Sequence, residues 1–100
     1  MITKVVFHID WEIEERLVMA LNNIENLFNE VPAEEASVSL IINGAAVQMF
    51  RRDRKNDYSD TIEELAEKGV HFCLCNNSLN KFEIDHSDLL SGWKLSKQVF

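Results

Sequence analysis

The sequence predicts an α/β domain in which helices cover both faces of a mostly parallel sheet, a three-layer α/β/α arrangement. Short runs of β-branched and aromatic residues, typical of buried strands, alternate along the chain with segments of helical periodicity. Such alternation implies right-handed crossovers between parallel strands. With 100 residues, 46% of them hydrophobic, the chain has the size and composition of a single domain over residues 1–100.

The first two elements are a strand at residues 5–9 and a long helix. Asp10 follows the strand as the expected N-cap, and glutamates cluster after it, where the helix dipole favours negative charge. Apolar residues then recur at steps of three and four from Leu17 onward, which indicates an amphipathic helix. We expect Pro32 to end this helix.

The middle of the chain predicts a second strand, a short helix and a surface loop. Residues 37–42 alternate and then become continuously apolar, which is typical of a strand that enters a core. Asn43 and Gly44 interrupt the strand pattern, and residues 45–50 predict the short helix. Residues 51–57 are polar and charged, as expected for a loop.

A second long helix and a third strand follow the loop. Asp60 and Glu63 have the spacing of a capping box, and a glycine closes the predicted helix. Residues 70–75 predict the third strand, which ends at three polar residues. Asn77 or Ser78 is the expected N-cap of the helix after it.

The C-terminal part predicts one helical turn at residues 85–90 and a last strand within residues 93–100. A sheet of this size with a short C-terminal end would leave an edge or an apolar face uncovered, which predicts a homo-oligomer. The candidate interface residues, each of which also suits the core, are Met49, Phe50, Phe82 and Trp93.

Charge and cysteine content restrict the partners and the compartment. The formal net charge of −7 opposes phosphate binding, so no nucleic-acid partner is expected. No apolar run approaches the roughly 18 residues of a membrane helix, and the first residues do not form a signal peptide. Because two cysteines make no disulfide framework, we expect a cytoplasmic protein with both thiols reduced.

A cysteine and several polar residues follow the predicted strands, at the edge where chemistry gathers in α/β sheets. Cys75 is the most informative, because it ends a buried strand just before a helix start, where backbone N–H groups favour the nucleophilic thiolate. Alternatively, Cys75 is a small buried hydrophobe. Likewise, His8 is either a proton partner of Cys75 or a surface residue. The candidate binding or supporting residues are His8, Asn43, Gly44, Asn76, Asn77 and Ser78.

Other motifs predict structure rather than chemistry. Cys73 is expected on the same side of the sheet as Cys75, deeper in the core, as a structural residue. From His71 to Cys75 a strand extends about 13 Å, too far for a single zinc ion, so no metal is expected. The sequence has no glycine-rich phosphate-binding loop, and no cofactor is expected. The Ser/His/Asp group around His86 lacks the strained turn of a nucleophilic serine.

The pattern around Cys75 extends along most of the chain. It comprises Val70-x-Phe72-x-x-Cys75-x-Asn77-Ser78-Leu79, then Ile84, Asp88-Leu89-Leu90 and Gly92, with Lys4-Val5-Val6-Phe7-His8 and Leu40-x-x-Asn43-Gly44-x-Ala46-Val47 before it. This pattern resembles the DsrE/DsrF-like family of small sulfur-relay proteins over residues 4 to about 95. The C-terminus departs from the family, because residues 96–100 lack its usual Val-Pro-x-Gly-Val turn.

The resemblance implies a three-layer α/β fold that assembles into trimers or hexamers. It also implies that a cysteine carries sulfur as a persulfide and hands it to a partner protein, and this role falls on Cys75 alone. Two hypotheses follow. Either the chain is a sulfurtransferase-like carrier with a sulfur donor and acceptor, or it is a non-catalytic binding or assembly module. In the second case a crevice at the strand ends holds a small ligand and Cys75 is structural.

Overall fold

The computed structural model describes residues 2–54 and 57–100. Residues 55 and 56 of the predicted loop at 51–57 lie outside the described residues. The helices and strands are β1 (Thr3–Ile9), α1 (Glu14–Glu30), β2 (Ala36–Ile42), α2 (Asp57–Glu67), β3 (His71–Leu74), α3 (Asn76–Lys81), α4 (Ser91–Ser96) and β4 (Gln98–Val99). Short 3-10 helices lie at Ala33–Glu35, Gly44–Phe50, Arg52–Arg54 and His86–Asp88.

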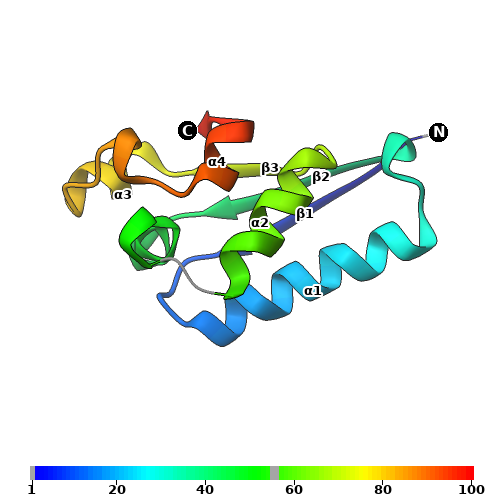
Figure 1. The fold of residues 1–100 in the computed structure, drawn as a ribbon, viewed down its shortest axis with the longest axis horizontal. Helices are drawn as coiled ribbons and strands as arrows, with labels where there is room; N and C mark the ends of the chain where they lie inside the picture. The colour runs from blue at the N-terminus through cyan, green and yellow to red at the C-terminus, as the bar shows by residue number, and fades with distance from the viewer. Residues whose placement is uncertain (1, 55–56) are drawn as a thin grey trace.

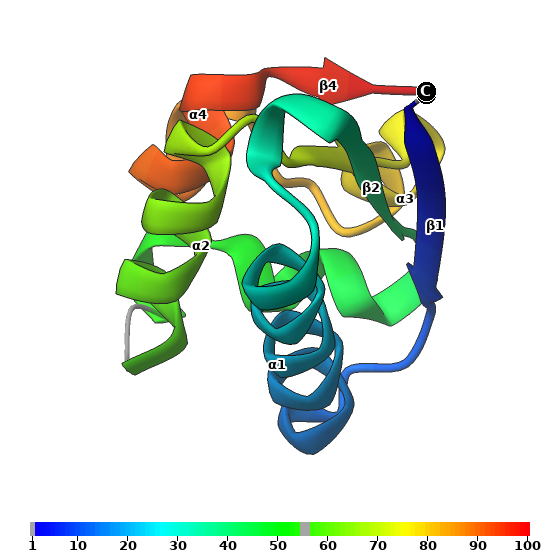
Figure 2. The same ribbon diagram turned by 90° about the vertical axis from the view of Figure 1, so that its right-hand side faces the viewer.

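The four strands form one parallel sheet in the order β1-β2-β3-β4. Because consecutive strands are neighbours, right-handed crossovers place the connecting helices on one face of the sheet. Figure 2 shows α1, α2 and α4 together on that side. Figure 1 shows α3 beyond the carboxyl ends of the strands. The predicted α/β class and parallel sheet are therefore confirmed.

The two faces of the sheet differ in burial. On the face toward the helices, Leu40 of β2 and its register partner Phe72 of β3 are fully buried. On the other face, here called the open face, Val6 is 68% exposed. Ile41 and Cys73, which are register partners on the open face, are half-buried. Within residues 2–54 and 57–100, α1, α2 and α4 cover the one face of the sheet, and the open face is the more exposed.

Helix α1 begins later than predicted. Ile13 occupies the N-cap position and no side chain caps the helix, so the prediction that Asp10 is the cap is wrong. The chain makes a turn first, in which the Ile13 N–H donates to the Trp11 carbonyl at 2.8 Å. This turn leaves the Trp11 side chain 63% exposed. The helix ends at Glu30, shortly before Pro32, as expected.

Helix α2 begins earlier than predicted. It starts at Asp57, so Asp60 and Glu63 lie within the helix instead of forming a capping box at its start. Gly69 follows the helix with a φ of +101°, a left-handed conformation that favours glycine. The short helix predicted before α2 is a 3-10 helix over Gly44–Phe50.

The core lies between the sheet and the helices. Phe50 and Phe72 meet with their ring centroids 5.9 Å apart. Met49, Phe50 and Trp93 are buried within the chain, and Phe82 is half-buried against the same core. Of the two alternatives for these residues, core or subunit interface, the structure of the single chain places Met49, Phe50 and Trp93 in the core.

The C-terminal segment forms a helix and a short strand, where a strand alone was predicted at 93–100. Helix α4 packs closely on α2, and a Cβ at Gly92 would lie only 2.8 Å from the Glu63 backbone nitrogen. Lys97 ends α4 in a left-handed conformation, and β4 then pairs with β3. Among the described residues, no helix has the length and apolar content needed to span a membrane.

Candidate functional site

The candidate site lies at the carboxyl ends of β2 and β3, which a backbone hydrogen bond connects. The Cys75 N–H donates to the Ile42 carbonyl at 2.9 Å, so the chain after β3 stays attached to β2. Cys75 itself occupies the N-cap position of α3 and is half-buried. The first N–H groups of a helix have no partner within the helix, so this position favours a negative charge.

Ser78 connects the two strand ends. Its Oγ accepts a hydrogen bond from the Gly44 N–H at 2.8 Å. This hydroxyl lowers the pKa of Cys75, as do the backbone N–H groups of Ser78 and Asn77, while partial burial acts in the opposite direction. The lowered pKa favours thiolate, the nucleophilic form.

The backbone conformation at position 44 favours glycine. Its φ of +57° is left-handed, and a Cβ at this position would lie 2.8 Å from the carbonyl oxygen of Asp10. A side chain would therefore strain the turn and push it away from β1. Because the Gly44 N–H holds the Ser78 hydroxyl, Gly44 positions the group that stabilises the Cys75 thiolate.

His8 agrees with the second of its two alternatives, a hydrogen-bonded residue at the surface. Its Nε2 is 2.9 Å from Oδ1 of Asn43, and both side chains are at the surface end of the site. Strand β2 lies between β1 and β3, which separates the backbones of these two strands by about 10 Å. The register aligns His8 with Ile41 and Cys73 instead. His8 is not among the groups that lower the pKa of Cys75.

The two asparagines contribute through their backbones. The Asn76 N–H donates to the Phe100 carbonyl at 2.8 Å, which ties the end of the chain to the site. The Asn77 N–H lowers the pKa of Cys75. The prediction that Asn77 or Ser78 caps the helix is wrong, because both lie within α3 and Cys75 holds the cap position without a side-chain cap.

Cys73 lies on the open face rather than in the core. It is half-buried, and its Sγ is 3.9 Å from the His71 carbonyl oxygen. Burial raises the pKa of the Cys73 thiol, in contrast to Cys75. Both cysteines are free. No group of His, Cys, Asp or Glu side chains among the described residues is arranged to hold a metal ion.

The polar residues around His86 form a turn. The Ser87 hydroxyl donates to the Asp85 carboxylate at 3.0 Å, and the His86 ring meets the Trp93 ring edge-on at 5.4 Å. These contacts leave neither side chain arranged for a Ser/His/Asp triad.

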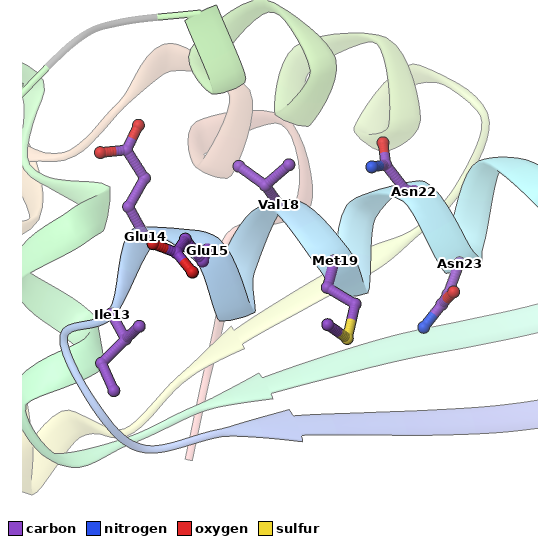
Figure 3. Close-up of a pocket in the computed structure, with 7 residues that line it drawn as sticks. All are labelled: Ile13, Glu14, Glu15, Val18, Met19, Asn22 and Asn23. Carbon is purple, nitrogen blue, oxygen red and sulfur yellow. The ribbon is translucent and has the colours of Figure 1, made fainter.

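A hollow that the sequence analysis missed lies on helix α1, away from the element that carries Cys75. Figure 3 shows Val18 and Met19 along the helix, with Glu14 and Glu15 at its N-terminal end. Met19 is 63% exposed. The sequence does contain a signal for this surface. Val18 and Met19 are apolar, but they fall outside the apolar stripe of the helix that begins at Leu17.

Comparison with known proteins identifies relatives of the whole chain. A family model described as the DsrE/DsrF-like family matches residues 4–98. The fold is similar to a solved structure of MTH1491 from Methanobacterium thermoautotrophicum, a protein of unknown function, with a TM-score of 0.81 and 33% sequence identity. The match covers 98% of this chain and 81% of MTH1491. No curated protein matches significantly.

Proposed function

The chain belongs to the DsrE/DsrF-like family, and on that premise we propose that it carries sulfur as a persulfide on Cys75. The observation that carries the proposal is the thiolate-stabilising environment of Cys75. The Ser78 hydroxyl, which accepts a hydrogen bond from the Gly44 N–H, and the N–H groups of Asn77 and Ser78 lower the pKa of Cys75. A low pKa, together with partial exposure, is what a reactive cysteine requires.

The transfer proceeds by two exchange reactions. The Cys75 thiolate attacks the outer sulfur of a donor persulfide, a Cys75 Sγ–S bond forms, and the donor leaves as a thiolate. A partner thiolate then attacks the outer sulfur of the Cys75 persulfide, and the Cys75 thiolate leaves. The sulfur atom moves without net oxidation or reduction, so no cofactor is needed. A low pKa also makes Cys75 a good leaving group.

The carrier requires reduced thiols and a partner. We therefore propose a cytoplasmic location, where cysteines are kept reduced. The half-buried position of Cys75 leaves its sulfur within reach of donor and acceptor thiols.

Mass spectrometry of the intact protein tests the proposal. After incubation with glutathione persulfide, the folded protein should gain one sulfur atom that a thiol reductant removes. Cys75→Ser should gain none, whereas the matched control Cys73→Ser should gain sulfur like the parent. A parent protein that gains no sulfur while folded would contradict the carrier function.

We also propose that the chain assembles with copies of itself, as the trimers or hexamers that the family resemblance implies. Exposed apolar side chains support this, since Val6 on the open face is 68% exposed and Phe100 is 57% exposed. Surfaces of this kind are typical of subunit contacts. Sedimentation at micromolar concentration should show an assembly, and a protein that is entirely monomeric there would contradict the proposal.

The alternative function is a binding or assembly module with a structural Cys75. The hollow in Figure 3 favours it, because it offers an apolar surface that the carrier chemistry does not use. In that case Cys75 should resist alkylation until the protein unfolds. Alkylation of the folded protein therefore distinguishes the two functions.

A further inference from the structure

Strand β1 lies at an edge of the sheet, where half of its backbone groups point away from β2 (Figure 2). The Ile9 carbonyl accepts a hydrogen bond from the Asn43 N–H at 3.2 Å, so Ile9 directs its backbone groups toward β2. Successive residues of a strand direct these groups to opposite edges, so the N–H and C=O groups of Lys4, Val6 and His8 point outward. Among the described residues, no backbone group pairs with them there.

The outer edge of β1 has few of the features that keep sheet edges apart. Pairing with β2 runs without a bulge through all seven residues of Thr3–Ile9, and the strand has no proline. Lys4 is its one lysine, and Val6 at its centre is 68% exposed. Strand β4 at the opposite edge has only two residues. The β1 edge is therefore the one suited to pair with a further strand.

The helix layer is also open beside β1. Phe7 of β1 lines a hollow together with Met19, Ala20 and Asn23 of α1. Met19 is 63% exposed, and Figure 3 shows Met19 and Asn23 pointing from α1 toward the strands. A single extended peptide would pair with β1 and leave the helix layer uncovered. A second copy of the chain brings both a strand and a helix to this edge, so it fits both layers.

We propose that β1 pairs antiparallel with β1 of a second copy, across a twofold axis at Val6, which joins the two sheets into one. This contact rests on the self-assembly proposed above and specifies one of its interfaces, and it is independent of the carrier chemistry. A twofold contact suits a closed assembly, because the same surface is used by both copies. In a hexamer it would connect two trimers.

The sequence of β1 favours one register for this pairing. Centring on Val6 pairs all seven residues of one strand with all seven of the other. Val6 then lies opposite the partner's Val6, and Lys4 lies opposite the partner's His8. At each of these positions the two residues exchange both of their N–H···O bonds. A register centred on Lys4 would pair fewer residues and place two lysines opposite each other, which is unfavourable.

Sedimentation equilibrium of Val6→Lys at micromolar concentration tests the contact. In the single chain the new lysine would extend into solvent, because Val6 is exposed on the open face. Across the twofold axis two lysines would meet, so the mass of the assembly should fall to about half that of the parent. Val6→Thr is the matched control. It keeps a β-branched side chain and the same backbone groups, and it should sediment like the parent. Circular dichroism checks that both variants are folded.

Amide hydrogen exchange of the parent tests the pairing without relying on a variant that folds. In the assembled parent, the outward N–H groups of Val6 and His8 should exchange at least about tenfold more slowly than amides without a hydrogen-bond partner. The Phe7 N–H points to β2 and should be protected whether or not the copies pair. Slow exchange at all three consecutive residues is therefore the expected result, because a free edge would protect only Phe7.

The outcomes separate this contact from self-assembly in general. An assembled parent whose mass is unchanged in folded Val6→Lys would overturn the β1 contact and leave self-assembly in place. Rapid exchange at Val6 and His8 in the assembled parent would overturn it as well. A Val6→Thr protein of half the parent's mass would show that side-chain burial rather than strand pairing holds the copies together. A monomeric parent would contradict self-assembly and this contact together.

Discussion

Cys73 and Cys75 are separated by one residue on the same side of the sheet, but their thiols have opposite environments. At Cys75 the strand has ended, and hydrogen bonds from Ser78 and Asn77 lower the pKa. At Cys73 the strand continues between two neighbours, and burial raises the pKa. The position relative to the strand end, rather than residue type or net charge, therefore decides which cysteine is nucleophilic.

The largest expected effect is a difference in alkylation rate between the two cysteines. In the folded protein at neutral pH, Cys75 should react with iodoacetamide at least about tenfold faster than Cys73, since Cys75 has the larger thiolate fraction. Rates measured on Cys73→Ser and Cys75→Ser isolate each thiol. Equal rates, or a faster Cys73, would remove the proposed distinction between the two residues.

Gly44→Ala should reduce that difference. Alanine at a φ of +57° is strained, and its Cβ would meet the Asp10 carbonyl, so we expect a loss of about 1–3 kcal/mol of stability. The displaced N–H would also release Ser78, and Cys75 should alkylate more slowly. Gly69→Ala is the matched control, because its φ is also positive but a Cβ there meets nothing. It should lose stability without slowing Cys75.

Ser78→Ala tests the hydroxyl directly. Without the hydroxyl, Cys75 keeps its backbone hydrogen bonds but loses the largest contribution to its lowered pKa. One hydrogen bond contributes about 1 kcal/mol, so alkylation of Cys75 near neutral pH should slow by a few-fold. Cys73 should react as before. An unchanged Cys75 rate would show that the backbone alone stabilises the thiolate.

The sequence predicted the elements of this site better than their contacts. Cys75 and the polar residues after it were found because strand ends and helix starts are local patterns. The hydrogen bond from Gly44 to Ser78 depends on the register between β2 and β3, which no local pattern contains. The two alternatives for His8 stayed open for the same reason, because strand order decides which strand ends are neighbours.

Local sequence patterns also did not predict which face of the sheet the helices cover. Ser37 and Ser39 alternate with the buried Val38, which indicates a strand with one open side, but the apolar run at 40–42 suggests burial on both. The open face follows from the strand order β1-β2-β3-β4, in which every right-handed crossover returns on the same side. Strand order is a tertiary property, so one sequence alone predicts it poorly.

The smallest expected effect is on the pH dependence of stability. Cys75 loses its proton more easily in the folded protein than in the unfolded chain, so its contribution to stability increases with pH and is lost as the pH falls through its folded pKa. The raised pKa of Cys73 has the opposite effect, a contribution that is complete at lower pH and is lost as the pH rises through its folded pKa.

These opposite signs can be separated with two variants. Cys73→Ser retains only Cys75 and should gain stability relative to Cys75→Ser as the pH increases through the ordinary cysteine pKa of about 8.5. The change is small because both thiols are partly solvated and water screens their interactions. Urea denaturation midpoints of both variants, compared at neutral and alkaline pH, measure it. If the difference between the variants stays constant or reverses sign, the two thiols do not have opposite environments, and the assignment of the carrier role to Cys75 rather than Cys73 loses its physical basis.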